Sequence, residues 1–296
     1  RSLYNSGMSS SPWLVRPPQS ADAAPLAAIT TATTPHHIRQ TMAQTDGRFW
    51  TLTHHAQPIG YAALLPLPGL PHLFELTGGI APEFRRQGAG SFLWQAVCQA
   101  VMGTAVQQIT HTVPALDTPT ACFLQHHGFA PEHEEWTMSL DPLPAALLAP
   151  PTRSGQLRQV DQVTAVRTLP PLYERCFAYT AWFQPYSAAE VSATWEPNDE
   201  LWTLVVDAAP IGFAWLHRPT PNAAEIEPIG IVREKQGMGY GRTLLTTLLQ
   251  QLQNRGIQTV SLGVWANNET AVRLYQSLGF RHVSSSYSLT YTLSST

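Results

Sequence analysis

Hydrophobic and polar positions in the second half of the chain switch between the period of strands and the period of helices. "LWTLVVDAAPIGFAWL" (Leu201 to Leu216) holds two runs of β-branched and aromatic residues around a short Ala-Ala-Pro turn, which predicts a β-hairpin. "EIEPIGIV" (Glu225 to Val232) predicts a further strand. Between Gly241 and Gly256 the leucines recur at the spacing of one helix face, and Gly256 is placed to end that helix. The leucines of this face are Leu244, Leu245, Leu248, Leu249 and Leu252.

Two more elements follow the leucine helix. "TVSLGVW" (259–265) has the composition of a strand, and "NETAVRLYQSLGF" (268–280) predicts a second helix. Asn268 is able to cap the start of this helix and Gly279 its end. Because strands and helices interleave, we predict a mixed α/β domain.

The same pattern occurs earlier in the chain. "FWTLTHHAQPIGYAAL" (Phe49 to Leu64) resembles 201–216, with its tryptophan and its glycine 152 positions earlier. "RRQGAG" precedes "QGMGYG" by 151 positions, and "FLQHHGF" precedes "LYQSLGF" by the same 151. Landmarks that keep almost one offset predict a duplicated domain of about 150 residues.

The 296 residues suit two domains of ordinary size. We predict an N-terminal domain at 8–140, a linker at 141–155 and a C-terminal domain at 156–296. The linker, "DPLPAALLAPPTRSG", concentrates proline, alanine and small polar residues. An ordered strap lying across an interdomain interface is the alternative interpretation of this segment.

Composition excludes several classes of function. A net charge of −3 gives no basic face for nucleic acid. The three cysteines, Cys98, Cys122 and Cys176, have no paired spacing, which suits a reducing compartment and argues against a disulfide framework. No apolar run reaches the ~18 residues of a membrane span, and the start of the chain lacks the features of a signal peptide. We therefore expect a cytoplasmic protein that binds neither a membrane nor nucleic acid.

"REKQGMGYGRTLL" (233–245) carries three glycines directly before the leucine helix. Glycines there let a backbone approach a ligand closely, and the helix N-terminus suits a phosphate because its N–H groups are unpaired. A P-loop would need a Gly-Lys-Ser/Thr ending, and a dinucleotide fingerprint would need G-x-G-x-x-G after the first strand. Neither this loop nor "RRQGAG" has those patterns.

In this setting the loop resembles the acyl-CoA pyrophosphate loop, Q/R-x-x-G-x-G/A, of the GCN5-related N-acetyltransferase (GNAT) superfamily. The pattern is filled in the second copy by Gln236, Gly239 and Gly241, and in the first by Arg85, Gly88 and Gly90. A second family signature, N-x-x-A-x-x-L-Y-x-x-x-G-F, matches at Asn268, Ala271, Leu274, Tyr275, Gly279 and Phe280. The two signatures occur in order, and the resemblance covers most of both halves.

The resemblance implies an α/β (α+β) protein of two tandem domains, each with a mixed, mostly antiparallel central sheet flanked by helices. It also implies acetyl-CoA, or another acyl-CoA, as cofactor. The implied binding residues are Ile229, Gly230, Ile231, Gln236, Gly237, Met238, Gly239, Tyr240, Gly241, Arg242 and Asn268, with Arg85, Arg86, Gln87, Gly88, Ala89 and Gly90 as first-copy candidates. The arginines among them would add charge-assisted contacts to phosphates.

The family chemistry is direct attack by a substrate amine on the acetyl thioester. An ammonium must lose a proton and the departing thiolate must gain one. Tyr275 matches the position of the usual general acid, and a phenol of pKa ~10 suits that role. The alternative is a tyrosine that only packs its ring into the core.

A proline inside the predicted strand at 225–232 indicates a bulge or an unpaired edge, because proline cannot donate in a sheet ladder. The family's central strands separate at the position of Pro228. Glu225 and Glu227 lie two residues apart and so face the same side of the strand. Burial would raise the pKa of such a carboxylate and let it accept the amine proton. Glu227 is the first choice because it is nearer Pro228, and Glu225 is second; a solvated strand glutamate is the alternative.

The first copy keeps the phosphate loop but differs at the implied catalytic positions. By the 151-residue offset, Leu124 replaces Tyr275, Leu76 replaces Glu227, Phe74 replaces Glu225 and Asp117 replaces Asn268. We interpret the N-terminal domain as catalytically silent, with CoA binding left open.

Histidines form the adjacent pairs His36/His37, His54/His55 and His126/His127. Neighbours on a strand point to opposite faces, and none of these pairs has the i, i+4 spacing of a helical zinc site. We predict no metal site.

Four aromatic residues, Trp182, Phe183, Tyr186 and Trp195, precede the second hairpin. Family members build the acceptor wall in this region, which allows an apolar or aromatic acceptor. Packing in the core is an equally good explanation.

The first functional hypothesis is an acetyl-CoA-dependent N-acetyltransferase that acts on a primary amine of a small molecule or peptide, with its chemistry in the C-terminal domain. The duplication is similar to the tandem arrangement of mycothiol synthase, in which one half is active, but no residue specifies that acceptor. The second hypothesis is a non-catalytic acyl-CoA-binding or sensing protein. The presence of Tyr275 in one copy alone favours an enzyme.

Overall fold

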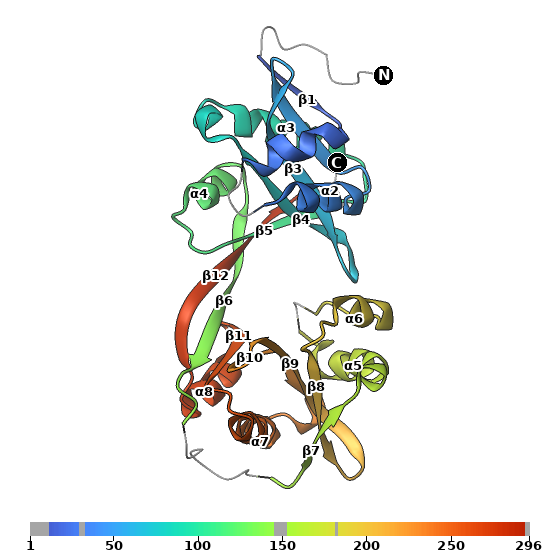
Figure 1. Cartoon of the computed structure of the whole chain (residues 1–296), viewed down its shortest axis with the longest axis vertical. Helices are drawn as coiled ribbons and strands as arrows, with labels where there is room; N and C mark the ends of the chain where they lie inside the picture. Colours follow the sequence, from blue (N-terminus) through green and yellow to red (C-terminus); the bar gives the residue numbers. More distant parts are fainter. Residues whose placement is uncertain (1–11, 30–32, 145–152, 181–182, 294–296) are drawn as a thin grey trace. The chain divides into compact units, whose positions relative to one another are not determined.

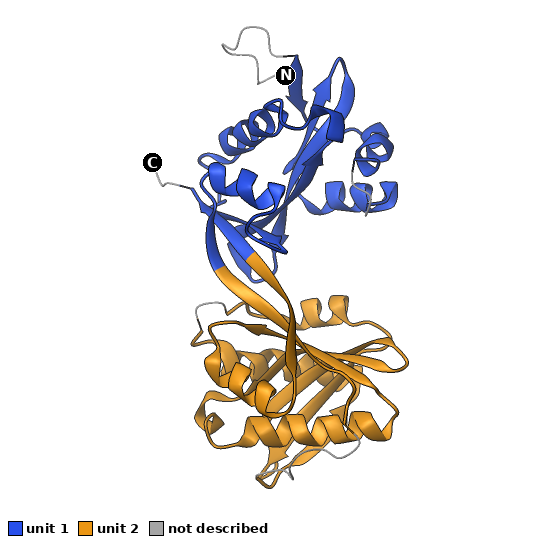
Figure 2. Cartoon of the chain, turned by 90° about the vertical axis from the view of Figure 1, so that its left-hand side faces the viewer, with its two compact units in different colours: residues 1–132, 288–296 blue, residues 133–287 orange. Residues whose placement is uncertain are grey.

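The computed structural model describes residues 12–29, 33–144, 153–180 and 183–293 of the chain. It divides into two compact units, residues 1–132 with 288–296 (unit 1) and residues 133–287 (unit 2), coloured separately in Figure 2. These units differ from the predicted domains 8–140 and 156–296, because each copy gives its last strand to the other unit. Residues 145–152 of the predicted linker lie outside the described residues.

Unit 1 is built on a sheet with the strand order β1-β2-β3-β4-β5-β12 (Figure 1). Neighbours from β1 to β4 are antiparallel, and β4 and β5 are parallel. The strands are β1 (Trp13–Arg16), β2 (Phe49–His54), β3 (Gln57–Leu67), β4 (Leu70–Ile80), β5 (Gln108–Val113) and the end of β12 (Arg281–Thr292). The helices are α1 (Ala23–Ala27), α2 (Pro35–Gln44), α3 (Ala89–Val101) and α4 (Pro119–His126).

Unit 2 repeats the architecture with the strand order β6-β11-β10-β9-β8-β7. Only β10 and β11 are parallel among the described strands of this sheet. The strands are β6 (Ala130–Leu140), β7 (Gln156–Val160), β8 (Glu200–Val206), β9 (Ala209–Thr220), β10 (Ala223–Ile231) and β11 (Thr259–Trp265). The helices are α5 (Gln162–Phe177), α6 (Ala188–Thr194), α7 (Tyr240–Asn254) and α8 (Glu269–Ser277). The predicted fold class, a mixed and mostly antiparallel sheet flanked by helices in each copy, is confirmed.

The predicted hairpins and helix ends are present, with one adjustment at the turns. The turn of the second hairpin is Asp207–Ala208, both at positive φ, rather than Ala-Ala-Pro, since β9 already begins at Ala209. His55–Ala56 form the equivalent turn in unit 1. Two residues at positive φ match the twist of a tight hairpin. As predicted, the Asn268 side chain caps α8 by accepting from the N–H of Ala271, and Gly279 follows α8 at φ +96°.

Both faces of the unit 2 sheet are covered, because successive strand side chains point to opposite faces. One face packs against α7 and α8, with Ile226, Leu262 and Leu249 among its buried residues. The other packs against α5 and α6, with Phe213 and Leu169 among its buried residues. Each such side chain stabilises the fold by about 1.5–3 kcal/mol on burial.

The last strand of each copy completes the sheet of the other unit. Residues 135–140 of β6 pair antiparallel with β11, so that Met138, with no exposed surface, joins the α7–α8 side of the unit 2 core. In unit 1, the Thr110 hydroxyl of β5 donates to the carbonyl of Leu289, and the N–H of Leu293 donates to the carbonyl of Gln107. The offset pattern of the sequence did not predict this exchange, because a repeat reveals similarity but not which strands pair.

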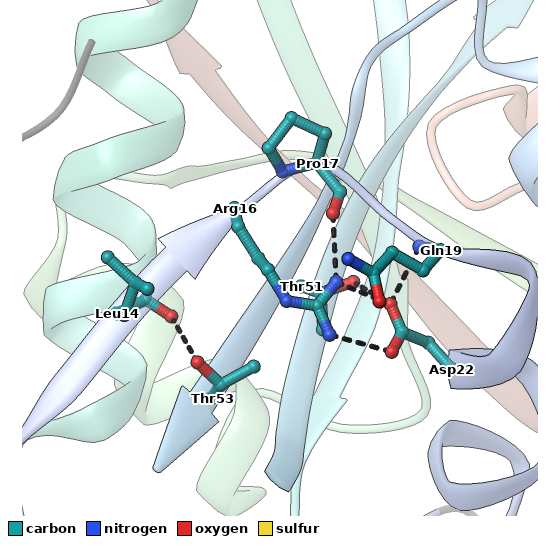
Figure 3. A network of polar contacts seen from close by, with 7 residues as sticks. All are labelled: Leu14, Arg16, Pro17, Gln19, Asp22, Thr51 and Thr53. Carbon is teal, nitrogen blue, oxygen red and sulfur yellow. Dashed lines mark hydrogen bonds and ion pairs between the residues drawn. The ribbon is translucent and has the colours of Figure 1, made fainter. Parts of the chain in front are cut away.

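A buried ion pair fixes the start of unit 1 (Figure 3). Arg16 on β1 donates through both terminal nitrogens to the two carboxylate oxygens of Asp22, each at 2.7 Å. Asp22 also accepts from the N–H of Gln19 at 2.7 Å and from the hydroxyl of Thr51 on β2 at 3.3 Å. Paired and hydrogen-bonded in this way, the carboxylate can be buried at 3% exposure.

Candidate active site

The glycine-rich loop of unit 2 runs from Gln236 to the start of α7. Gly237 and Gly239 have φ values of +70° and +87°, and Gly239 is the N-cap of α7. A Cβ at Gly237 would meet nothing within 4 Å, so glycine is required there by the backbone conformation and not by lack of space. Gly88, the N-cap of α3, has the same conformation in unit 1 at φ +91°. Both copies therefore point a helix N-terminus out of the loop, as phosphate binding requires.

The first residue of the loop pattern holds the loop in place. The side-chain nitrogen Nε2 of Gln236 donates to the carbonyl of Ile231 at 2.8 Å, and the Tyr179 hydroxyl donates to Oε1 of Gln236 at 2.8 Å. In unit 1, Nε of Arg85 donates to the carbonyl of Ile80, also at 2.8 Å. Gln236 and Arg85 thus each tie the loop of their own unit to the end of the neighbouring strand. The loop backbone, rather than these side chains, is then the part suited to contact a phosphate.

The last glycine of the pattern allows close packing of helices. A Cβ on Gly241 would lie 3.3 Å from the side chain of Leu274 on α8, and one on Gly90 would lie 3.2 Å from Phe123 on α4. A larger residue would push the helix that carries the loop away from its neighbour. The loop geometry therefore depends on this contact in both units.

Other predicted binding residues have contacts of their own. Arg242 donates to the hydroxyl of Ser277 at 2.5 Å, and the Gln87 side chain donates to the carbonyl of Glu83 at 2.6 Å. Arg153, which the sequence did not single out, donates through Nε to the carbonyl of Met238 at 2.9 Å. Arg153 and Arg242 thus place two cations beside the unit 2 loop, where an anionic ligand would be stabilised.

The parallel strands β10 and β11 separate at the centre of unit 2. They pair from Ala223 opposite Thr259 to Ile226 opposite Leu262, after which β10 continues against β9 and β11 against β6. The register of β10 shifts between Ile226 and Ile229, which confirms the bulge predicted at Pro228. This separation exposes a strand edge next to the loop, as an extended ligand needs.

Two carboxylates meet over β11 at this point. A Cβ built on Gly263 would lie 2.7 Å from Oε1 of Glu135 and 3.0 Å from Oε2 of Glu227. Glu227 belongs to β10 and was predicted; Glu135 belongs to β6 and was missed, because it comes from the last strand of the first copy. Glu225 faces the same side, opposite Ser261.

The electrostatics distinguish Glu227 within this group. Although the side chain retains solvent access, burial of its carboxyl group and then the charges of Glu135 and Glu225 raise the pKa of Glu227 to about 7. Burial also raises the pKa of Glu135 above its usual range. Glu227 is therefore partly protonated at neutral pH and able to exchange a proton there.

Tyr275 on α8 is 6% exposed and packs against Phe280, with ring centroids 6.0 Å apart. Burial, and then the charge of Glu227, raise the pKa of Tyr275 well above its usual value. Tyr275 is thus both a core residue and an electrostatic neighbour of Glu227. Its phenol keeps its proton at neutral pH.

Part of the predicted aromatic wall lies near the carboxylates. Tyr186 contacts Tyr173 of α5 with centroids 4.8 Å apart, and Phe183 stacks on the same tyrosine at 5.9 Å. The charge of Glu227 contributes to a raised pKa of both tyrosines, after burial as the larger cause. Trp195 instead packs on Trp215 in the core, and Trp182 lies outside the described residues.

Strand registers correct two correspondences between the copies. Leu76 pairs with Leu64 as Ile226 pairs with Leu216, so Leu76 takes the position of Ile226, and Glu227 lies in the bulge that follows. Glu75 of β4 pairs with Thr110 as Glu225 pairs with Ser261, so Glu75, and not Phe74, takes the position of Glu225. β10 has one extra residue at its bulge, so equivalent residues of the two copies are 150 positions apart before the bulge and 151 positions apart after it. The first copy therefore retains one carboxylate.

The equivalent strand separation in unit 1 is bridged. Nδ1 of His111 on β5 lies 2.7 Å from the carbonyl oxygen of Leu76 on β4. Leu124, at the position of Tyr275, is 2% exposed and carries no ionisable group. The N-cap of α4 is Thr118 rather than Asp117, because α4 is one residue shorter than α8.

Within the described residues no group of three or more His, Cys, Asp or Glu is placed to hold a metal ion. Nor is any helix in the described part of the chain long and apolar enough to cross a membrane.

A mixed sheet whose parallel pair separates beside a glycine-capped helix is the arrangement that the sequence resemblance leads one to expect for an acyl-CoA-dependent acyltransferase. The chain belongs to the Acetyltransferase (GNAT) family, whose sequence profile matches residues 17–129 and 168–280. The resemblance found in the sequence is thereby confirmed, the protein is an acyltransferase, and acetyl-CoA is the acyl donor that its family uses.

Relatives include enzymes named mycothiol acetyltransferase. The one from Acidothermus cellulolyticus is 28% identical over 225 residues, which are 69% of this chain and 67% of that protein. The one from Paenarthrobacter aurescens is 36% identical over 90 residues, which are 29% of this chain and 28% of that protein. The second match therefore concerns a minor part of the relative.

Two solved structures show the same fold over nearly the whole chain. A GCN5-related N-acetyltransferase from Sphaerobacter thermophilus has a TM-score of 0.67 at 19% identity, covering 96% of both chains. A tandem GNAT protein from the clavulanic acid biosynthesis pathway, solved without AcCoA, has a TM-score of 0.64 at 17% identity, covering 96% of this chain and 99% of that one.

Proposed function

We propose that the protein transfers an acetyl group from acetyl-CoA to a primary amine, that unit 2 is the catalytic unit, and that Glu227 and Tyr275 are its base and acid. The observation that carries the proposal is that Glu227 lies where β10 and β11 separate and is an electrostatic neighbour of Tyr275. Glu227 has a pKa of about 7, and the phenol of Tyr275 is protonated at neutral pH.

Bound acetyl-CoA would supply the thioester to be attacked. The loop backbone from Gln236 to Gly241 would hold its pyrophosphate, and the strand edge at Ile229 to Ile231 would orient its extended arm. Glu227, partly ionised at neutral pH, would take a proton from the substrate ammonium so that its nitrogen becomes nucleophilic. Tyr275, whose phenol is protonated at neutral pH, would donate its proton to the sulfur as the carbon–sulfur bond breaks, and would regain one from the new amide nitrogen.

The amine acceptor of the mycothiol acetyltransferases is the first acceptor to test, because several relatives carry that name. Carboxylates beside tyrosine rings favour a cationic amine over a neutral or anionic acceptor. The acceptor panel should also contain amino sugars, polyamines and peptides with free N-termini.

The decisive experiment compares turnover by the wild type and Tyr275→Phe across this panel. We expect the substitution to lower kcat by roughly 10²–10⁴, while a matched control, Tyr291→Phe in unit 1, stays within about twofold, since surface and distant changes have small effects. Unchanged turnover in Tyr275→Phe would remove that residue from the mechanism.

A non-catalytic acyl-CoA sensor is the second candidate function, and the duplicated loop favours it, since both helix N-termini have the same geometry. Calorimetry with acetyl-CoA counts the sites. Tight binding without turnover of any amine supports the sensor, and a stoichiometry of two assigns a site to unit 1.

A further inference from the structure

Glu135 lies outside every catalytic position that the sequence patterns predict. It is on β6, opposite Trp265 of β11, within the segment that the first copy gives to unit 2. Its Oε1 and the Oε2 of Glu227 both lie against the bare Cα of Gly263, at 2.7 Å and 3.0 Å from the point where a Cβ would stand. The distance between Oε1 of Glu135 and Oε2 of Glu227 is therefore no larger than the sum of these two distances.

The position of Gly263 makes this meeting possible. β11 runs between β10 and β6, so a side chain at this position would stand between the two carboxylates. Glycine leaves the space over the strand open, and both carboxylates reach into it from opposite sides. A single small cation, such as a primary ammonium, can then donate a hydrogen bond to each of the two carboxylates, because an ammonium carries three N–H donors.

Resting on the function proposed above, we propose that Glu135 is the second carboxylate of the acceptor site, and that Glu135 and Glu227 together bind the ammonium group of the amine substrate. One ammonium N–H donates to a carboxylate oxygen of Glu135. A second N–H gives its proton to Glu227, and the nitrogen lone pair left behind forms the bond to the acetyl carbon. The carbon–sulfur bond breaks, and the sulfur takes the proton of Tyr275. The new amide nitrogen then loses its second proton, which restores the Tyr275 phenol and leaves a neutral amide.

The other ionisable groups around the pair fit a cationic substrate. Glu225 faces the same side and adds negative charge. His217 lies opposite Glu225 and is held by Asp199 at 2.8 Å, and His133 stacks on Trp265 with ring centroids 3.8 Å apart. The phenols of Tyr173, Tyr186 and Tyr275 are uncharged at neutral pH, because burial raises their pKa values. The carboxylates thus outnumber the groups able to carry positive charge.

Through Glu135, the first copy takes a direct part in the proposed chemistry. β6 brings Glu135 from the half of the chain that lacks its own acid, so the half that is silent by itself completes the site of the other.

The first test is Glu135→Gln in the full chain, with Glu134→Gln as the matched control. Glu134 is the neighbouring residue, points to the other side of β6, and accepts from Trp136, Ser285 and Tyr287. We expect Glu135→Gln to raise the KM for the amine at least tenfold, with the KM for acetyl-CoA within twofold of wild type. The acid limb of kcat/KM should also move to lower pH, because removal of a negative neighbour makes Glu227 easier to ionise. An amine KM and an acid limb equal to those of wild type would overturn the proposal.

Gly263→Ala is a second variant that removes no charge. Its methyl group would displace the two flexible carboxylates rather than the backbone, so we expect an unchanged melting temperature with a raised amine KM. Wild-type KM in this variant would contradict the shared site.

A third measurement separates this proposal from the proposed function. Carbon-13 NMR of labelled glutamate carboxyl groups follows the titration of Glu227 without any turnover. A lower midpoint in Glu135→Gln than in wild type supports the pair even if no amine is acetylated, and an identical midpoint refutes it. Failure of the wild type to acetylate any amine would refute the enzymatic function alone.

Discussion

Met138→Ala provides the sharpest test of the strand exchange. By sequence Met138 belongs to the N-terminal copy, but the structure places it in the unit 2 core between β11 and the helices α7 and α8. The side chain has no exposed surface. The substitution should therefore destabilise unit 2 and leave unit 1 unaffected.

The size of the effect follows from burial. Truncation of a fully buried methionine to alanine costs about 2–5 kcal/mol, from the lost transfer free energy and the cavity left behind. A domain is stable by about 5–15 kcal/mol in total, so this loss is a large fraction of the free energy of unfolding of unit 2. Because each 1.4 kcal/mol is about tenfold in an equilibrium constant, amide protection should fall by roughly tens to thousands of times.

Native-state hydrogen exchange, read by mass spectrometry peptide by peptide, assigns the loss to a unit. Peptides from β10, β11 and α7 should lose protection, while peptides from β3 and α3 should not. Met102→Ala is the control, because Met102 is 64% exposed and its truncation should change stability by less than about 0.5 kcal/mol. Loss of protection in unit 1 with unit 2 unaffected would refute the exchange.

Three further outcomes are expected. Below pH 7, kcat/KM should fall about tenfold per pH unit, because only the ionised form of Glu227 is a base. Burial and neighbouring charges raise the pKa of this residue to about 7. A value of kcat/KM that stays constant down to pH 5 would exclude Glu227 as the base. Asp22→Ala should cost unit 1 about 2–4 kcal/mol in thermal melts at pH 7. Burial, the largest single cause, would raise the pKa of Asp22, but the hydrogen bonds from Arg16, Gln19 and Thr51 and the charge of Arg16 together outweigh it and lower the pKa. The stabilisation by this carboxylate is therefore present above about pH 4 and disappears as the pH falls further. A destabilisation by Asp22→Ala that is as large at pH 2 as at pH 7 would contradict this. Gly241→Val should weaken acetyl-CoA binding in calorimetry by displacing α7 from Leu274, and wild-type affinity would show that the loop tolerates the shift.

Local elements were predictable because their causes are local. The leucine spacing of α7, the caps at Asn268 and Gly279 and the proline in β10 each act within a few residues, and each prediction was confirmed. The duplication could be detected because landmarks recur at one offset.

Features set by strand pairing could not be predicted in the same way. The bulge at Glu227–Pro228 shifts the offset by one residue, which led the sequence comparison to match Phe74 with Glu225 when the registers match Glu75. Likewise Glu135 is 92 positions before Glu227, and only the exchange of β6 brings it to the site. A sequence repeat carries no signal for either.

The asymmetry between the copies follows from the exchange. Unit 1 keeps the anchor from Arg85 to Ile80 and the glycine-capped helix, but His111 bridges the strand separation through which a thioester would have to be reached. The 151-residue offset places Ser286, a residue without charge, at the position of Glu135. β12 therefore returns no carboxylate to unit 1, while β6 delivers one to unit 2. If the proposed pair binds the substrate amine, the first copy is needed for the chemistry of unit 2 even without a catalytic site of its own, because its last strand β6 carries Glu135.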